Sequence, residues 1–135
     1  MPLKVAGSLD RRQTWSILMG IALGWITCHI RELRATAVGI EGGGDALFVV
    51  LIACSGAVAT LLYPSECWPG PFGVAVGVAA HACLVPGAQA SPFFGVLVGG
   101  TLLLSLLPAL LVHVIYRVVK ENVRAPRAER ETPRQ

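Results

Sequence analysis

The chain has 135 residues, which is enough for one domain and leaves no length for a second hydrophobic core. Hydrophobic residues make up 54% of it and charged residues 14%, and its mean hydropathy is +0.65. Because soluble domains usually carry about 25% charged residues, this composition favours a membrane protein. The net charge of +3 does not indicate nucleic-acid binding, since acidic residues are mixed with the basic ones and no recognition motif accompanies them.

The chain begins with a short basic segment, residues 1–13, followed by an apolar run that we predict as the first membrane span, residues 14–30. A cleaved signal peptide is the competing interpretation, because a basic segment, an apolar run and a small-residue site at residues 35–37 are its three parts. Charged residues lie between the run and that site, which is unusual for a cleaved signal. Cys28 lies in a weak lipoprotein-type cleavage context, because Trp25 occupies a position that calls for an aliphatic residue.

Residues 31–45 form the longest connection. Apolar residues in it are spaced for one helical face, so this part either lies in the membrane interface or prolongs the first helix. Three further apolar runs predict spans at residues 46–63, 69–86 and 93–116. The last is the longest, and roughly 24 helical residues extend ~36 Å, enough for a hydrocarbon core of ~30 Å. The third is the shortest and the richest in Gly and Ala, so whether it crosses fully stays open.

Basic residues are concentrated in the two terminal segments. Three lie before the first span and six in residues 117–135, against two in the first loop and none in the second and third. Because basic flanks stay on the cytoplasmic side, the consistent topology has four spans and both termini in the cytoplasm. The sequence therefore predicts an all-α membrane protein with a four-helix transmembrane bundle over residues 14–116 and a tail that is largely disordered after residue 123. The excess of Arg over Lys is typical of a GC-rich bacterial genome, which indicates a bacterial inner membrane.

Three of the four predicted spans carry a Gly-xxx-Gly motif. In lipid, small residues four positions apart let two helix backbones approach closely and mark contact faces. We therefore predict helix packing at these six glycines, in a compact bundle or in one that also docks on a partner. The motif residues are Gly20, Gly24, Gly73, Gly77, Gly95 and Gly99.

No Asp, Glu, Lys or Arg falls inside any predicted span. Ion-coupled transporters usually place a charge there, so ion-coupled transport within a single chain is disfavoured. The sequence also contains no recognised catalytic motif, and we expect neither a catalytic site nor a cofactor.

Cysteine and histidine side chains are the remaining candidates for chemistry. In the predicted topology, four of them lie in the outer halves of the first and third spans, where they could hold copper or zinc. Cys28 and Cys83 could instead form a disulfide on the oxidising side. Plain packing is the third interpretation, since the spacing matches no ligand motif. The metal candidates are Cys28, His29, His81 and Cys83.

Three functions are compatible with these observations. The leading expectation is a structural or accessory membrane protein, surrounded by the lipid bilayer, that packs through its glycine faces against itself or a larger complex. The second is a small transporter or channel subunit that is competent only as an oligomer. The third is a membrane metal or thiol-redox protein that uses the cysteine and histidine candidates.

Overall fold

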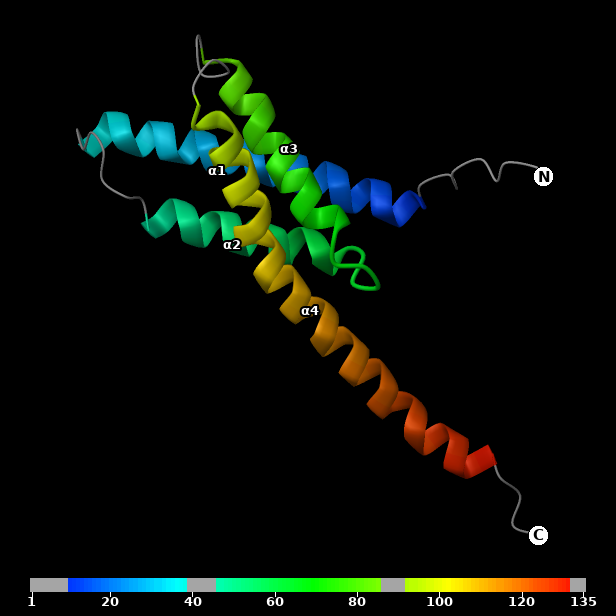
Figure 1. Ribbon diagram of the computed structural model, residues 1–135. Coiled ribbons are helices and arrows are strands. Elements are labelled where there is room, and N and C mark those ends of the chain that lie inside the picture. Colours follow the sequence, from blue (N-terminus) through cyan, green and yellow to red (C-terminus); the bar gives the residue numbers. More distant parts are fainter. Residues whose placement is uncertain (1–9, 39–45, 86–91, 132–135) are drawn as a thin grey trace, which may run out of the picture.

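The computed structural model describes residues 10–38, 46–85 and 92–131, which contain four α-helices and no strand (Figure 1). The prediction of an all-helical protein is confirmed. Most of the predicted basic segment at the start of the chain, and the last residues of the tail, lie outside these ranges. The helices are α1 (Arg11–Val38), α2 (Ala46–Leu61), α3 (Pro69–Cys83) and α4 (Phe94–Glu131).

The local sequence explains where two of the helices begin. Asp10 precedes α1, and its backbone N–H donates to the Gln13 side chain at 3.0 Å, as in a capping box. Pro69 and Pro71 occupy the first turn of α3, where a missing backbone N–H breaks no helical hydrogen bond.

Two helices are longer than the predicted spans. Of the two interpretations of residues 31–45, prolongation of the first helix is the one observed, up to Val38. α4 likewise continues to Glu131, through residues for which the sequence led us to expect largely disordered chain after residue 123. Both extensions contain residues that favour helices, Arg, Glu, Leu and Ala in residues 31–38, and Arg, Lys, Glu and Ala in residues 117–131.

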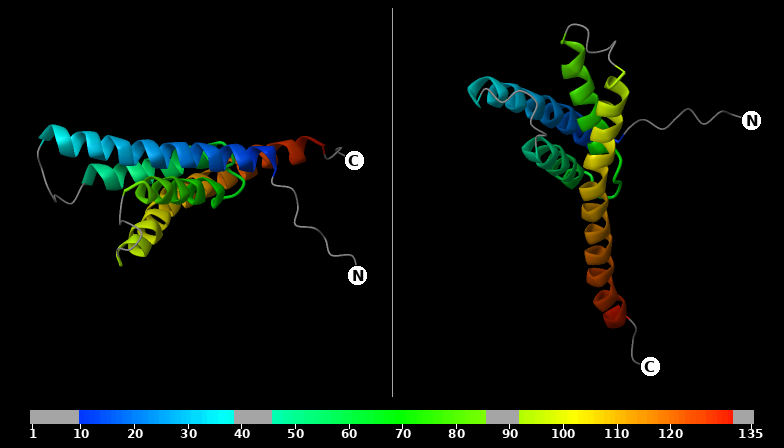
Figure 2. Two further views of the ribbon diagram at one scale, coloured as in Figure 1. Left: turned by 90° about the horizontal axis from the view of Figure 1, so that it is seen from above. Right: turned by 60° about the vertical axis from the view of Figure 1, so that its left-hand side comes forward.

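The four helices do not pack as a symmetric bundle. α1 crosses α3, and α2 lies alongside α1 (Figure 2). α2 and α3 each contact the other three helices, whereas α1 and α4 do not touch within the described parts of the chain. The C-terminal half of α4 extends away from the other helices (Figure 1). The centre of the fold is therefore formed by α2 and α3.

The buried core is small. Ile52 of α2 packs with Val74 and Val78 of α3, and these side chains are at most 1% exposed. Most large apolar side chains are exposed instead, among them Phe93 at 74% and Leu107 at 67%. An exposed apolar surface of this extent marks contact with a membrane or with other proteins.

One described segment, Phe94–Val123 of α4, is long and apolar enough to cross a membrane. α2 is apolar but has 16 residues, and α3 has 15, whereas an untilted span needs about 20. One of the four predicted spans thus meets the criterion of length and composition, and the four-span arrangement stays a prediction.

Where α1 crosses α3, the two helices touch through backbone atoms rather than through side chains. A Cβ atom at Gly24 of α1 would overlap the backbone oxygen of Val74, and one at Gly77 of α3 would overlap that of Ile21. Only residues without a side chain allow the helices to approach so closely, which is the principle of the Gly-xxx-Gly contact. The other two motif glycines of these helices lie in the same contact, Gly20 against Gly70 and Gly73 against Ile17.

Gly95 and Gly99 of α4 carry the same motif but are placed differently. No described residue lies within 4 Å of a Cβ atom built at either position. α4 approaches α2 elsewhere, at Gly56, where a Cβ atom would overlap the backbone oxygen of Ser105. Ser105 is about 120° around the helix from Gly99, so this contact turns the α4 motif away from α2. Within the described chain, the α4 motif is not used for packing.

Replacing Gly77 with Ala should destabilise the folded protein by about 1–3 kcal/mol, because the added methyl group must displace the α1 backbone. Gly99→Ala is the matched control, since its methyl group meets open space and Ala favours a helix over Gly by ~1 kcal/mol. Thermal unfolding of the purified proteins in detergent, followed by circular dichroism, measures both changes. Equal stability of the two variants would contradict the backbone contact.

Candidate functional site

The C-terminal halves of α1 and α3 bring together polar side chains that lie far apart in the sequence. Trp25, Cys28, His29 and Glu32 occupy positions i, i+3, i+4 and i+7, which places them on one face of α1. The backbone contact between the two helices holds this face against the end of α3, where His81 lies.

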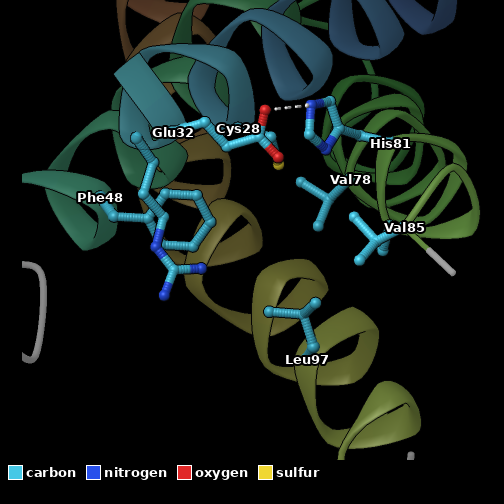
Figure 3. Close-up of a pocket in the computed structure, with 9 residues that line it drawn as sticks. Cys28, Glu32, Phe48, Val78, His81, Val85 and Leu97 are labelled. Carbon is cyan, nitrogen blue, oxygen red and sulfur yellow. Dashed lines mark ion pairs between the residues drawn. The ribbon is translucent and has the colours of Figure 1, made fainter. Parts of the chain in front are cut away.

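Glu32 and His81 make a polar contact across the two helices at this point. The Nε2 atom of His81 and the Oε2 atom of Glu32 lie 3.5 Å apart, and Figure 3 marks this pair with a dashed line. The same Glu32 oxygen lies 3.8 Å from Nδ1 of His29, one turn earlier on α1. One carboxylate oxygen thus has an imidazole nitrogen on either helix within 4 Å. We call these three residues the His–Glu–His cluster.

His81 is the buried member of the cluster. Its side chain is 11% exposed, against 63% for His29 and 53% for Glu32. The Trp25 ring packs edge-on against the His81 ring with the centroids 5.2 Å apart. Packing therefore holds the His81 imidazole in place, whereas the two α1 side chains are free to adjust their torsions.

A cavity of about 340 Å³ adjoins the cluster, with walls from all four helices (Figure 3). Glu32 and His81 belong to its wall, as does Arg31, whose guanidinium lies 5.0 Å from the centroid of the Phe48 ring. The rest of the wall carries no charge and consists of Cys28, Phe48, Val78, Ala82, Val85 and Leu97. The cluster is thus accessible to a small molecule or to water from a mainly apolar space.

Two of the four metal candidates from the sequence, His29 and His81, come together in the structure. Cys28 lies in the cavity wall and Cys83 is exposed, but neither belongs to the group of ligating atoms that lie within 4.8 Å of one another. None of the four cysteines of the chain, all of which the structure describes, takes part in a disulfide. The disulfide between Cys28 and Cys83 is therefore not formed in this structure.

Glu32 is the residue of the cluster that the sequence analysis missed. We placed it in a connection, because charged residues usually mark the end of a membrane helix. The available signal was its spacing from His29, since residues three positions apart share a face wherever the helix continues. That signal becomes informative only once α1 is known to run to Val38.

Other polar side chains join helix ends without taking part in the cluster. Nδ1 of His113 lies 2.8 Å from the backbone oxygen of Pro64, which fastens α4 to the turn between α2 and α3. Glu66 in that turn accepts hydrogen bonds from the Gln13 amide at 3.0 Å and from the Trp68 indole at 2.6 Å. The contacts of His113 and Gln13 have a structural role, because each joins two distant segments of the chain.

Comparisons of the chain with models of known protein families, with curated proteins and with solved structures find no match. Function is therefore inferred from the residues and contacts of this chain. The features available for it are the His–Glu–His cluster, the cavity beside it and the exposed face of α4.

The state of the cysteines provides a test of the side-chain arrangement. All four cysteines should take up an alkylating reagent that is added when the membranes are solubilised, and prior reduction should add no further label, because no disulfide protects them. Intact-mass spectrometry of the denatured protein counts the labels. An increase by two labels after reduction would show that a disulfide exists and would contradict the structure.

Proposed function

We propose that this chain is an integral membrane protein whose four helices all lie in the bilayer, with both termini on the cytoplasmic side of a bacterial inner membrane. The support is the distribution of apolar surface, since every helix exposes large apolar side chains. Lipid accommodates such a surface, whereas water does not. Examples, one from each helix in chain order, are Leu18, Val50, Phe72 and Leu107.

The charges of α1 fit this arrangement. Its basic residues Arg11 and Arg12 lie in the first turn, and Arg31 is the next charged residue along the helix. The uncharged stretch between them is long enough to approach a full crossing, and the flanking arginines can extend their charged groups to the membrane surface.

The lengths of α2 and α3 need an additional explanation. Sixteen helical residues rise only ~24 Å, a few ångströms less than a typical hydrocarbon core. Exposed apolar residues continue beyond both helices, Leu62 after α2 and Leu84 with Val85 after α3. A bilayer also thins locally around short helices at a modest cost. The two helices together with their adjoining turns can therefore cross.

Topology reporters separate four crossings from the single crossing that α4 alone would make. With four spans, a reporter inserted at residue 42 or 88 should be external, whereas one at residue 66 or at the C-terminus should be cytoplasmic. With α4 as the only span, the reporters at 42, 66 and 88 should all lie on one side and the C-terminal reporter on the other. Paired alkaline phosphatase and fluorescent protein fusions measure this, and the second pattern would refute the four-span proposal.

Within the membrane, we propose that the protein is a structural or accessory subunit that assembles through α4. The observation that carries this is the contrast between equal motifs. The glycines of α1 and α3 are occupied by their mutual contact, whereas no other described part of the chain packs against Gly95 and Gly99. The most apolar window of α4 is only 17% buried within the chain. An outward-facing small-residue motif provides a surface on which another membrane helix can pack closely.

A second copy of α4 is the partner that we propose. A helix face that packs on its own image forms a two-fold contact to which both chains contribute the same residues. Because Gly95 and Gly99 lie near the start of α4 and such helices cross at about 40°, the basic C-terminal ends of the two helices diverge. Electrostatic repulsion between the tails therefore does not oppose the contact.

Gly99→Leu should lower the association constant of the dimer at least about fivefold, which corresponds to a loss of ~1 kcal/mol of association free energy. Gly100→Leu is the matched control, since it makes the same change one position outside the motif. Energy transfer between donor- and acceptor-labelled chains in proteoliposomes measures the association. A monomeric wild-type protein, or equal association of the two variants, would argue against assembly through α4.

A further inference from the structure

We infer that His29, Glu32 and His81 form a binding site for one divalent transition-metal ion, with Zn²⁺ as the representative of that class, and that the ion links α1 to α3. This inference goes beyond the proposed assembly role, which depends on different residues, the exposed glycine face of α4. The site also differs from the one expected from the sequence, because a carboxylate takes the place of the two thiols.

The distances between the three donor atoms are close to those that such an ion requires. Zn²⁺ lies ~2.0–2.2 Å from imidazole nitrogen and carboxylate oxygen in tetrahedral sites, so two of its ligand atoms are about 3.4 Å apart. The corresponding distances here are 3.5 Å between His81 Nε2 and Glu32 Oε2, and 3.8 Å between Glu32 Oε2 and His29 Nδ1. All three atoms lie within 4.8 Å of one another. Small torsional adjustments of the two exposed α1 side chains are sufficient to complete the coordination.

The framework that carries these atoms is well suited to preorganise them. His29 and Glu32 are three positions apart on one helix, which keeps their donor groups on the same face. His81 comes from the other helix, where it is 11% exposed and packed against Trp25. The α1–α3 backbone contact one to two turns away leaves little freedom in how the two helices approach each other.

The ligand types select the class of ion. Two imidazoles and one carboxylate suit Zn²⁺ and its neighbours in the first transition row, whereas Ca²⁺ and Mg²⁺ take oxygen ligands. The Glu32 carboxylate supplies negative charge for the dication. The nearby cation, Arg31, has its guanidinium against the Phe48 ring, which stabilises a positive charge there.

Three protein ligands leave at least one coordination position for water or a small ligand, as in zinc sites that are not purely structural. Glu32 and His81 also line the cavity of about 340 Å³, and with Trp25 and His29 they line a second one of about 310 Å³. Space for an exchangeable ligand therefore exists next to the cluster.

Zinc binding to the purified full-length protein tests the inference. The protein carries a histidine-free affinity tag, is stripped with a chelator in detergent, and is titrated with ZnCl₂ in a calorimeter. Bound zinc is counted by mass spectrometry after desalting. We expect one Zn²⁺ per chain and a higher unfolding temperature, because the ion binds the folded arrangement of both helices.

Glu32→Gln and His29→Gln each remove one ligand from an exposed position, so the fold is retained. Affinity should fall by at least about tenfold in either variant, since even changes outside the ligand set of a metal site have effects of this size. The unfolding temperature of each variant should no longer respond to zinc.

Glu66→Gln and His113→Gln are matched controls that remove the same chemical groups elsewhere, and both should bind zinc as the wild type does. Cys28→Ser should also leave binding unchanged. CoCl₂ in place of zinc should produce a visible d–d spectrum without the thiolate charge-transfer band that cysteine ligation would add. The inference is overturned if the wild type holds no stoichiometric zinc, if Glu32→Gln and His29→Gln bind normally, or if Cys28→Ser or the cobalt spectrum identifies a thiolate ligand.

Discussion

The direct contact between the backbones of α1 and α3 is the constraint on which the rest of the structure depends. Where lipid surrounds the helices, there is no hydrophobic driving force between them, and association relies on close van der Waals contact and on hydrogen bonds. Glycines on both helices provide the first, since any side chain at Gly24 or Gly77 would overlap the facing backbone. Ser16 provides the second, because its buried hydroxyl donates to the backbone oxygen of Ala59 at 2.7 Å and thereby joins α1 to α2.

Polar and charged groups occupy different parts of the fold. In the interior of the fold, most of the polar groups are hydroxyls. The hydroxyl oxygens of Thr27 and Ser55 lie 3.4 Å apart, and each hydroxyl also donates to a carbonyl of its own helix. Charged groups lie at the helix ends, where Glu32 remains 53% exposed beside the buried His81. Such a position avoids most of the desolvation penalty that a carboxylate would meet in the middle of the bilayer. The cluster thus joins a partly exposed carboxylate to a buried imidazole.

α4 has a different role from the other helices. It meets α2 through Gly56 and Ser105, and His113 fastens it to the α2–α3 turn. From Phe94 to Val123, most of the remaining α4 surface is apolar and uncovered by the described parts of the chain. The buried core is small and one long helix is exposed. We expect this of a protein whose apolar surface is covered by lipid and by a neighbouring helix rather than by its own chain. The His–Glu–His cluster and the α4 face are on separate elements, so the two proposed activities do not compete for the same residues.

The sequence by itself determined that the chain is helical, where the apolar segments lie and where α3 begins, because apolar run length, helix-favouring residues and prolines at helix starts act locally. It also proposed six glycines at which backbones could approach, and four of them lie in the contact between α1 and α3. Only the tertiary structure decided which of those glycines meet, since Gly77 and Gly99 have the same neighbours in kind and differ only in how their helices are rotated. The pairing of Glu32 with His81 was equally beyond the sequence, because it requires both the continuation of α1 past the apolar run and the angle at which α1 crosses α3.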